Sequence, residues 1–314
     1  MMQNFMIPSW IGRKQTLMDR RRGGMTTETG FIGLGLMGSA VAGRILTAAP
    51  LRVWNRTPAA CEPLIAAGAV AADSPAAVFE RCRTVFVMVT DEAAVDDVLA
   101  FDERLLRGRT IVQMSTVAPA YSEALAARVA RAGGAFVEAP VSGSRQPALD
   151  GRLISMLAGE EAAVEEAATL LQPACARVFR CGLPPQAMRM KLAVNVFLIT
   201  LATGLAEAFH LAEELDLPLT TLRDVLDAGP MASFVSRAKA TALIDDDFSP
   251  QAAIADVLKN ANLVVAAARE RGVSGPLMEE SARLYSEALL LGRGNDDMAA
   301  VIAAYRQRTR PARR

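Results

Sequence analysis

Two polar side chains in a long apolar segment have the types and the spacing needed for proton transfer. Lys191 and Asn195 lie four residues apart, which places both on one face of a helix. Burial lowers the pKa of a lysine, which can then release a proton near neutral pH, whereas arginine cannot. Beyond Lys14 the chain has only Lys191, Lys239 and Lys259. We expect Lys191 to be a general acid rather than a surface lysine. Asn195 is expected to orient it or bind a substrate oxygen, with a helix–helix hydrogen bond as the alternative.

A glycine-rich loop near the start of the chain has the pattern of a dinucleotide-binding turn. The loop follows an apolar strand, precedes the helical stretch Ser39–Leu46, and reads Gly33-Leu34-Gly35-Leu36-Met37-Gly38. In this pattern Gly33 permits a tight turn, Gly35 lets the backbone approach a pyrophosphate, and Gly38 lets the helix pack on the strand. The helix N-terminus offers N–H groups to phosphates. The loop predicts a bound cofactor rather than an empty turn, and the predicted contacts are Gly33, Gly35, Leu36, Met37 and Gly38.

The end of the second strand indicates which dinucleotide is bound. An NAD site usually has Asp or Glu there for the ribose hydroxyls. This chain has Asn55-Arg56-Thr57, so no carboxylate repels a 2′-phosphate and Arg56 can pair with one. We therefore expect NADP as the cofactor and NAD less, with Asn55, Arg56 and Thr57 as contacts. The alternative is that these residues form a solvated turn.

A third polar segment follows another strand, which ends at Pro140. Ser142-Gly143-Ser144 offers hydroxyl groups and exposed backbone at the edge of the sheet where ligands bind in α/β proteins, so an anion site is expected there, with a polar turn as the alternative. Arg145 is a further cation that either meets a substrate carboxylate or lies on the surface. His210, the single histidine, is expected to be packed inside the protein or at an interface.

The elements that must position these residues change in type along the chain. Up to Cys181, Ala-rich helical stretches alternate with apolar runs at Phe31-Ile32, Leu51–Trp54, Thr84–Val89, Thr110–Met114, Ala135–Val137 and Leu153–Leu157. This alternation predicts an α/β Rossmann-type fold, a doubly wound parallel sheet, over residues 25–185. A long helix over Gln186–Leu215 then opens an all-α domain, residues 186–314, for substrate and oligomer contacts. Residues 1–24, which carry five basic groups and one acidic group, are expected to be a disordered leader.

Composition excludes several classes of protein. The chain has 34 basic and 34 acidic residues, and a net charge of zero argues against a nucleic-acid partner. A single histidine excludes a multi-histidine metal cage, so no metal site is expected. The four cysteines have no CxxC spacing, which is typical of thiols in a reducing compartment, and we expect a cytoplasmic protein. Asn195 and the acidic residues at the end of the long helix argue against a membrane span.

Four motifs in order resemble those of the β-hydroxyacid dehydrogenases, a family that includes 3-hydroxyisobutyrate dehydrogenase, over roughly residues 29–306. They are Gly33–Gly38, Met114–Val117, Glu138–Ser144 and Met190–Asn195. The segment Ala139–Gly151 is most similar to the glyoxylate/succinic semialdehyde reductase branch.

The resemblance implies a Rossmann domain joined to an all-α domain, with the active site between them. Lys191 then matches the catalytic lysine and Asn195 its companion. Ser142-Gly143 and Thr116 match the substrate-carboxylate positions. Thr90 falls near the nicotinamide ribose, and Lys259 in the third family motif is expected to contact the cofactor.

Two positions depart from the family pattern. The family usually has Lys-Asp where this chain has Lys259-Asn260, and many of its reductases have an aromatic residue where this chain has Ala252. Phe248 lies four residues earlier and is a candidate substitute. These departures do not change the predicted reaction class, but they leave the identity of the substrate undetermined.

The sequence favours an NADPH-dependent reductase of small carboxylated aldehydes, such as glyoxylate or succinic semialdehyde. Three alternatives stay open: an NAD-dependent β-hydroxyacid dehydrogenase, an imine reductase, and a non-catalytic NADP-binding module. The long apolar helix has more apolar surface than one small domain covers, so we expect a homodimer or homotetramer.

Overall fold

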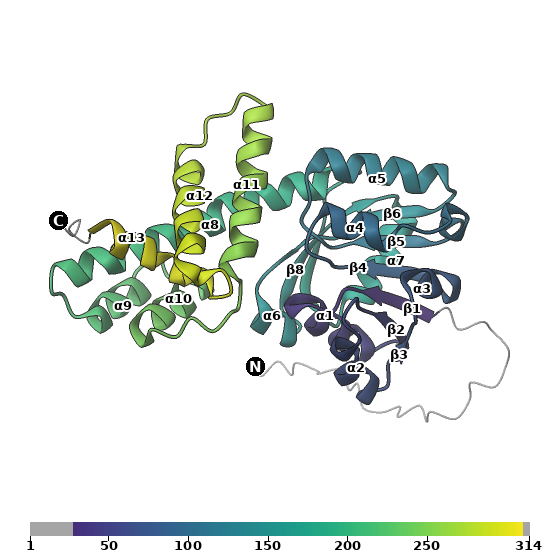
Figure 1. Ribbon diagram of the computed structural model, residues 1–314, viewed down its shortest axis with the longest axis horizontal. Coiled ribbons are helices and arrows are strands. Elements are labelled where there is room, and N and C mark those ends of the chain that lie inside the picture. The colour runs from purple at the N-terminus through teal and green to yellow at the C-terminus, as the bar shows by residue number, and fades with distance from the viewer. Residues whose placement is uncertain (1–27, 310–314) are drawn as a thin grey trace, which may run out of the picture.

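The computed structural model describes residues 28–309, and helix α8 (Gln186–Glu214) joins its two parts, a sheet flanked by helices and a group of helices (Figure 1). The predicted leader, residues 1–24, lies outside the described residues. The strands are β1 (Glu28–Ile32), β2 (Leu51–Trp54), β3 (Val70–Ala71), β4 (Cys82–Val87), β5 (Thr110–Gln113), β6 (Ala135–Glu138), β7 (Val141–Ser142), β8 (Leu153–Gly159) and β9 (Cys175–Arg180).

The sheet has the strand order of a dinucleotide-binding fold. The six strands in the order β3-β2-β1-β4-β5-β6 are all parallel, and the strand order reverses between β1 and β4, because β2 and β3 lie on one side of β1 and β4 to β6 on the other. The predicted α/β fold is therefore confirmed. Beyond β6 the sheet is mixed, because β8 runs antiparallel to both β6 and β7. The antiparallel direction of β8 and the strands β3, β7 and β9 were not predicted from the sequence, since β3 and β7 are only two residues long and β9 is largely exposed.

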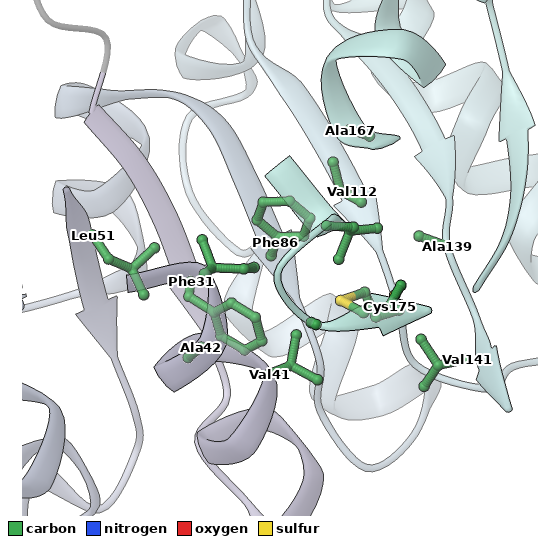
Figure 2. Packing of buried hydrophobic residues seen from close by; sticks show 14 of the residues in the cluster. Phe31, Val41, Ala42, Leu51, Phe86, Val112, Ala139, Val141, Ala167 and Cys175 are labelled. Carbon is green, nitrogen blue, oxygen red and sulfur yellow. The ribbon is translucent and has the colours of Figure 1, made fainter. Parts of the chain in front are cut away.

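Helices cover both faces of the sheet because successive residues of each strand point to opposite sides. Phe31 and Phe86 pack with α1 and α7 on one face, as Figure 2 shows for part of this core, while Ile32 and Val85 pack with α3, α4 and α5 on the other. The helices of this part are α1 (Leu36–Leu46), α2 (Glu62–Ala66), α3 (Pro75–Arg81), α4 (Glu92–Val98), α5 (Pro119–Arg131), α6 (Arg145–Leu149) and α7 (Glu161–Leu171), with the short 3-10 turns η1 (Pro58–Cys61) and η2 (Glu103–Leu106).

The second part is entirely helical, and α8 runs through its core. The other elements are α9 (Leu219–Ala228), α10 (Phe234–Asp245), α11 (Ile254–Glu270), α12 (Pro276–Ala288), η3 (Leu289–Arg293), η4 (Met298–Val301) and α13 (Ile302–Thr309). Phe209 on α8 and Tyr285 on α12 are completely buried between these helices. Helix α8 stops just before Asp216, whose left-handed backbone (φ 53°) ends the helical geometry ahead of Pro218.

A buried carboxylate fixes the beginning of α8 to the sheet. Glu138, at the end of β6, accepts hydrogen bonds from the backbone N–H groups of Ala187 and Met188 at 2.9 and 3.3 Å and from the Ser122 hydroxyl at 2.5 Å. These bonds satisfy donors that the first turn of any helix leaves free. Because Lys191 follows one turn later, the cap also sets where its side chain meets the sheet.

By length and mean hydropathy (1.8), α8 is apolar enough to cross a membrane. In this protein its buried residues pack against α10, α11, α12 and α13, and polar residues near its start face a cleft. Such an arrangement is typical of the core helix of a globular protein. The face of α8 that remains exposed includes Met190, Val196, Phe197 and Leu211, with Phe197 72% exposed.

Candidate active site

A cleft of about 430 Å³ lies between the carboxyl edge of the sheet and helices α8 and α11. It brings together fourteen of the residues singled out from the sequence: Gly33, Gly35, Leu36, Met37, Gly38, Asn55, Arg56, Thr57, Thr90, Thr116, Gly143, Lys191, Asn195 and Lys259. Ser142, also predicted, is half-buried on β7 and does not line the cleft. Arg145 is exposed outside the cleft, and His210 lies far along α8, where it contacts the Thr309 hydroxyl at 2.7 Å.

Each glycine of the loop between β1 and α1 is required for a different reason. Gly33 has a left-handed backbone (φ +96°), and a β-carbon there would collide with the Met88 carbonyl. A β-carbon on Gly38 would collide with the carbonyl oxygen of Gly33, which shows how closely the helix packs on the turn. At Gly35 a β-carbon would meet nothing within 4 Å, so this face of the loop is open to a ligand. The loop therefore fits the pyrophosphate of a dinucleotide.

The second strand ends in a structured turn beside this loop. Asn55 accepts a hydrogen bond from the Leu34 N–H at 2.9 Å and donates one to the Thr57 carbonyl oxygen at 3.0 Å. Asn55 thus ties the glycine loop to the turn. Arg56 is exposed at the cleft and forms no ion pair with any residue between 28 and 309. Its guanidinium group is accessible to an anion.

Lys191 is the buried cation of the cleft. It is 7% exposed, and burial lowers its pKa to about 8, with the charge of Lys259 as a smaller cause acting in the same direction. An amine with such a pKa is mostly protonated at neutral pH and gives up its proton far more readily than an ordinary lysine. The arrangement is suited to general acid chemistry.

Asn195 lies one turn after Lys191 on the same helix and is 2% exposed. Its amide nitrogen has no hydrogen-bond partner among the described residues. A buried donor without a partner costs folding free energy. A ligand oxygen that accepts from this N–H would supply the hydrogen bond that the folded protein does not make. Asn195 does not make the helix–helix hydrogen bond weighed in the sequence analysis through this nitrogen.

Lys259 bridges the two walls of the cleft. From α11 it donates to the Thr90 carbonyl oxygen beyond β4, with an Nζ–O distance of 2.5 Å. Burial lowers the pKa of Lys259, while the carboxylates of Asp256, Asp91 and Glu92 act in the opposite direction. This bond joins the helical part to the strand end on which a nicotinamide ribose is expected.

The two family departures both lie on the cleft wall. Ala252 and Asn260 line it, and the amide oxygen of Asn260 is buried without a donor among the residues described. Phe248 packs with the core of the helical part and does not line the cleft, so it does not replace the missing aromatic residue.

Some lining residues were not singled out from the sequence. Leu198 and Ile199 line the cleft one turn beyond Asn195, and the helical repeat counted from Lys191 would have found them. Gln251 and Met298 carry no such signal, because Gln251 lies in a bend and Met298 begins a short 3-10 helix, and only the tertiary structure brings them to the cleft.

Between residues 28 and 309 there is no group of three or more His, Cys, Asp or Glu side chains that could hold a metal ion. The four cysteines in that range are free thiols, and Cys61, Cys82 and Cys175 are buried.

Comparisons with known proteins agree with this geometry. A family model described as the NAD-binding domain of 6-phosphogluconate dehydrogenase matches residues 28–182, and one described as the NAD-binding domain of NADP-dependent 3-hydroxyisobutyrate dehydrogenase matches residues 186–305. The two models meet close to the start of α8. The second description agrees with the predicted NADP(H) cofactor.

The similar proteins include enzymes and a nuclear factor. Glyoxylate/succinic semialdehyde reductase 1 of Arabidopsis thaliana is 34% identical over 88% of this chain and 98% of its own length. Cytokine-like nuclear factor N-PAC of Xenopus tropicalis is 31% identical over 88% of this chain, which spans 53% of that protein. A solved structure of Psf3 in complex with NADP+ and 2-OPP is 28% identical, with a TM-score of 0.82 over 88% of this chain and 99% of that one.

The fold, the cofactor loop and these matches lead to one assignment. The chain belongs to the β-hydroxyacid dehydrogenase family, in its glyoxylate/succinic semialdehyde reductase branch, and is an NAD(P)-dependent oxidoreductase.

Proposed function

We propose that this protein is an NADPH-dependent reductase of small carboxylated aldehydes of the glyoxylate or succinic semialdehyde type, with Lys191 as general acid. The observation that carries the proposal is the burial of Lys191 in the cleft, which lowers its pKa to about 8. When bound, NADPH supplies the hydride. The chain must then hold the substrate and provide a proton.

The side chains of α8 meet those two needs together. The Lys191 ammonium group can protonate the carbonyl oxygen of the substrate as negative charge develops there. The unpartnered amide N–H of Asn195 can donate to the same oxygen or to Lys191 after it has lost its proton. Thr116 and Gly143, on the opposite wall, are the proposed contacts for the substrate carboxylate, with Ser142 supporting them from β7.

The preference for NADPH over NADH rests on Arg56. It is an exposed cation at the cleft, next to the turn that Asn55 ties to the glycine loop. A guanidinium group can pair with a 2′-phosphate through two parallel hydrogen bonds. The glycine loop, Thr57, Thr90 and Lys259 are proposed as the remaining cofactor contacts.

Assembly, compartment and domain limits complete the proposal. We place the Rossmann domain at residues 25–185 and the substrate domain at residues 186–314. Exposed apolar residues on α8, among them Phe197, make a homodimer or homotetramer the proposed assembly, which light scattering at micromolar concentration tests. The free thiols suit a reducing compartment, and the cytoplasm is proposed.

The decisive experiment measures NADPH oxidation against a panel of semialdehydes, 2-oxo acids, cyclic imines and uncharged aldehydes. Lys191→Ala should lower turnover by about 10²–10⁴-fold while NADPH still binds. Lys191→Arg is the matched control, because it keeps the charge but cannot release a proton near neutrality. A loss of less than about threefold in Lys191→Ala would show that the proton comes from elsewhere.

The same panel, extended to the oxidation of β-hydroxyacids with NAD, separates the other candidate functions. Reduction of cyclic imines in preference to aldehydes would indicate an imine reductase. Faster oxidation of β-hydroxyacids with NAD would indicate a dehydrogenase. Cofactor binding without turnover of any compound would indicate a non-catalytic module. This alternative is retained because one of the similar proteins is named a nuclear factor.

A further inference from the structure

Gln251 connects the two walls of the cleft at the substrate end. Its backbone carbonyl accepts a hydrogen bond from the Arg145 N–H at 3.4 Å, and its side-chain oxygen accepts one from the Gln146 N–H at 3.1 Å. Arg145 and Gln146 begin α6, two and three residues after Gly143. A glutamine from the helical part is therefore attached to the loop that is expected to hold the substrate carboxylate.

The bond to Gln146 fixes which way the amide points. A backbone N–H can only donate, so the side-chain atom that faces it must be Oε1. The other branch of the amide, Nε2, makes no hydrogen bond with any residue from 28 to 309. Gln251 lines the cleft beside Gly143 and Ala252. Its two N–H donors have no partner among the described residues and are available to a ligand.

A buried ion pair holds the backbone of Gln251 in place. Asp297 accepts hydrogen bonds from the N–H groups of Gln251 and Ala252, both at 3.1 Å, and from Lys239 at 2.7 and 2.8 Å. Asp297 is 2% exposed and Lys239 is 7% exposed. The Lys239 ammonium group balances the charge of Asp297, so the carboxylate that holds the Gln251 backbone does not repel an anionic ligand.

We propose that Gln251 is a specificity residue that donates from Nε2 to the carboxylate of the substrate. Its Oε1 meanwhile accepts the hydrogen bond from the Gln146 N–H, which joins it to the loop after Gly143. The Lys239–Asp297 pair acts on the substrate only through Gln251 and Ala252, as a positioning pair. The inference rests on the proposed reduction of carboxylated aldehydes and adds a donor that the family motifs do not include.

Two variants separate the role of the Nε2 donor from that of the hydrogen bond between Oε1 and the Gln146 N–H. Gln251→Glu keeps an oxygen for the Gln146 N–H but removes the donors and adds a negative charge, whereas Gln251→Met removes both functions without adding charge. Gln172→Glu, on an exposed glutamine at the end of α7, is the matched control for the charge change. Succinic semialdehyde is compared with butanal, an uncharged aldehyde of the same chain length.

Gln251→Glu should raise the KM for succinic semialdehyde by about tenfold or more relative to that for butanal, with kcat changed by less than about threefold, because hydrogen bonds to charged groups are among the stronger ones. Gln251→Met should show a smaller shift in the same ratio, and Gln172→Glu none. Equal increases for both aldehydes, or a change in the ratio below about twofold, would overturn the carboxylate contact.

A binding measurement keeps this test independent of turnover. Succinate, which cannot be reduced, is titrated calorimetrically into the NADP+-loaded wild type and variants, after thermal melts show that each variant is folded. The Kd should rise by about tenfold in Gln251→Glu, and an unchanged Kd would contradict the proposal. If the wild type reduces no carboxylated aldehyde, the proposed function fails, while the succinate titration still decides whether Gln251 contacts a carboxylate.

Discussion

The two ends of the cleft are built in opposite ways. At the cofactor end, one strand, one loop and one helix form the proposed pyrophosphate site, and Gly33, Gly35 and Gly38 lie within six residues of each other. At the substrate end, Gly143, Lys191 and Gln251 come from segments far apart in the sequence. The first end depends on local backbone geometry, and the second depends on how α8 and α11 dock against the sheet.

This difference has a physical consequence for stability. At the cofactor end the N–H groups of Gly33 and Leu34 are hydrogen-bonded to the end of β2 and the turn after it, and the loop has an open face at Gly35. The substrate end contains a buried lysine and an unpartnered Asn195 donor, both of which cost folding free energy. Buried polar groups of this kind are expected where function is concentrated, because a group that acts on a substrate must keep part of its hydrogen-bonding capacity free.

The largest expected effect is on Lys191, at the substrate end. Lys191→Met should lower kcat by about 10²–10⁴-fold and at the same time stabilise the protein. Folding lowers the pKa of Lys191 from 10.5 to about 8, so protonation of the buried amine destabilises the fold by about 3 kcal/mol at pH 7. That cost is nearly complete below pH 8 and disappears as the pH rises above 10.5, where the amine is neutral in both states.

Urea unfolding of the apo-protein checks the sign. The stability advantage of Lys191→Met over wild type should be about 3 kcal/mol at pH 7 and about 1 kcal/mol at pH 10. An advantage that does not shrink with pH would mean that packing, and not the charge, explains it. A variant less stable than wild type at pH 7 would show that the Lys191 ammonium group is not desolvated.

The second expected effect concerns the pair that anchors the substrate wall. Asp297→Asn removes the partner of buried Lys239 and should reduce the free energy of unfolding by about 3–5 kcal/mol. Its neighbour Asp296, in an exposed pair with Arg293, is the matched control, and Asp296→Asn should cost less than about 1 kcal/mol. Where Asp297→Asn still folds, the KM for the aldehyde should rise while the Kd for NADPH stays unchanged. An equal loss at both ends of the cleft would show that the two ends are not independent.

Arg56 provides the reciprocal test at the cofactor end. The wild type should prefer NADPH over NADH at least tenfold, and Arg56→Ala should weaken NADPH binding by about tenfold or more, with little effect on NADH, because only NADPH carries the 2′-phosphate. Fluorescence titration of both cofactors measures this. Arg52, whose guanidinium is already paired with Glu28, serves as the control position, and Arg52→Ala should not change the ratio. Equal affinity of the wild type for both cofactors would remove the role of Arg56.

The same contrast explains what the sequence could predict. The glycine loop, the Asn55-Arg56-Thr57 turn and the pairing of Lys191 with Asn195 follow local rules of turn geometry or helix spacing, and all of them line the cleft. Ser142 was expected in the cleft from its motif, but the structure places it on β7, outside the lining residues. Gln251 could not be predicted, because its contacts depend on Asp297, which is 46 residues away, and on α6 across the cleft. The strand at Leu153–Leu157 was predicted, but its antiparallel direction was not, because apolar residues do not reveal strand direction.

A smaller effect is expected from filling the space at Ala252. Ala252→Phe should narrow the substrate end and shift the ratio of kcat/KM values for glyoxylate and succinic semialdehyde by about tenfold in favour of glyoxylate, since one side chain in a pocket is worth about 1–3 kcal/mol of discrimination. Ala255→Phe, on the exposed first turn of α11, is the matched control and should leave the ratio unchanged. A ratio that does not move in Ala252→Phe would show that substrates do not reach this wall.

The smallest expected effect is a shift along the pH axis from Asn260. Asn260 lines the same cleft as Lys191, and its amide oxygen is buried without a donor. Asn260→Asp would place a negative charge there, which favours the ammonium form of Lys191 and raises its pKa from about 8. Because the ammonium form is the proposed proton donor, activity should persist to higher pH, and the basic limb of the kcat/KM profile should move upward by about 0.5–1 pH unit. Asn262→Asp, on the exposed side of α11 two residues later, is the matched control and should leave the limb in place. A basic limb that stays fixed in Asn260→Asp, or moves downward, would mean that this limb does not report the titration of Lys191.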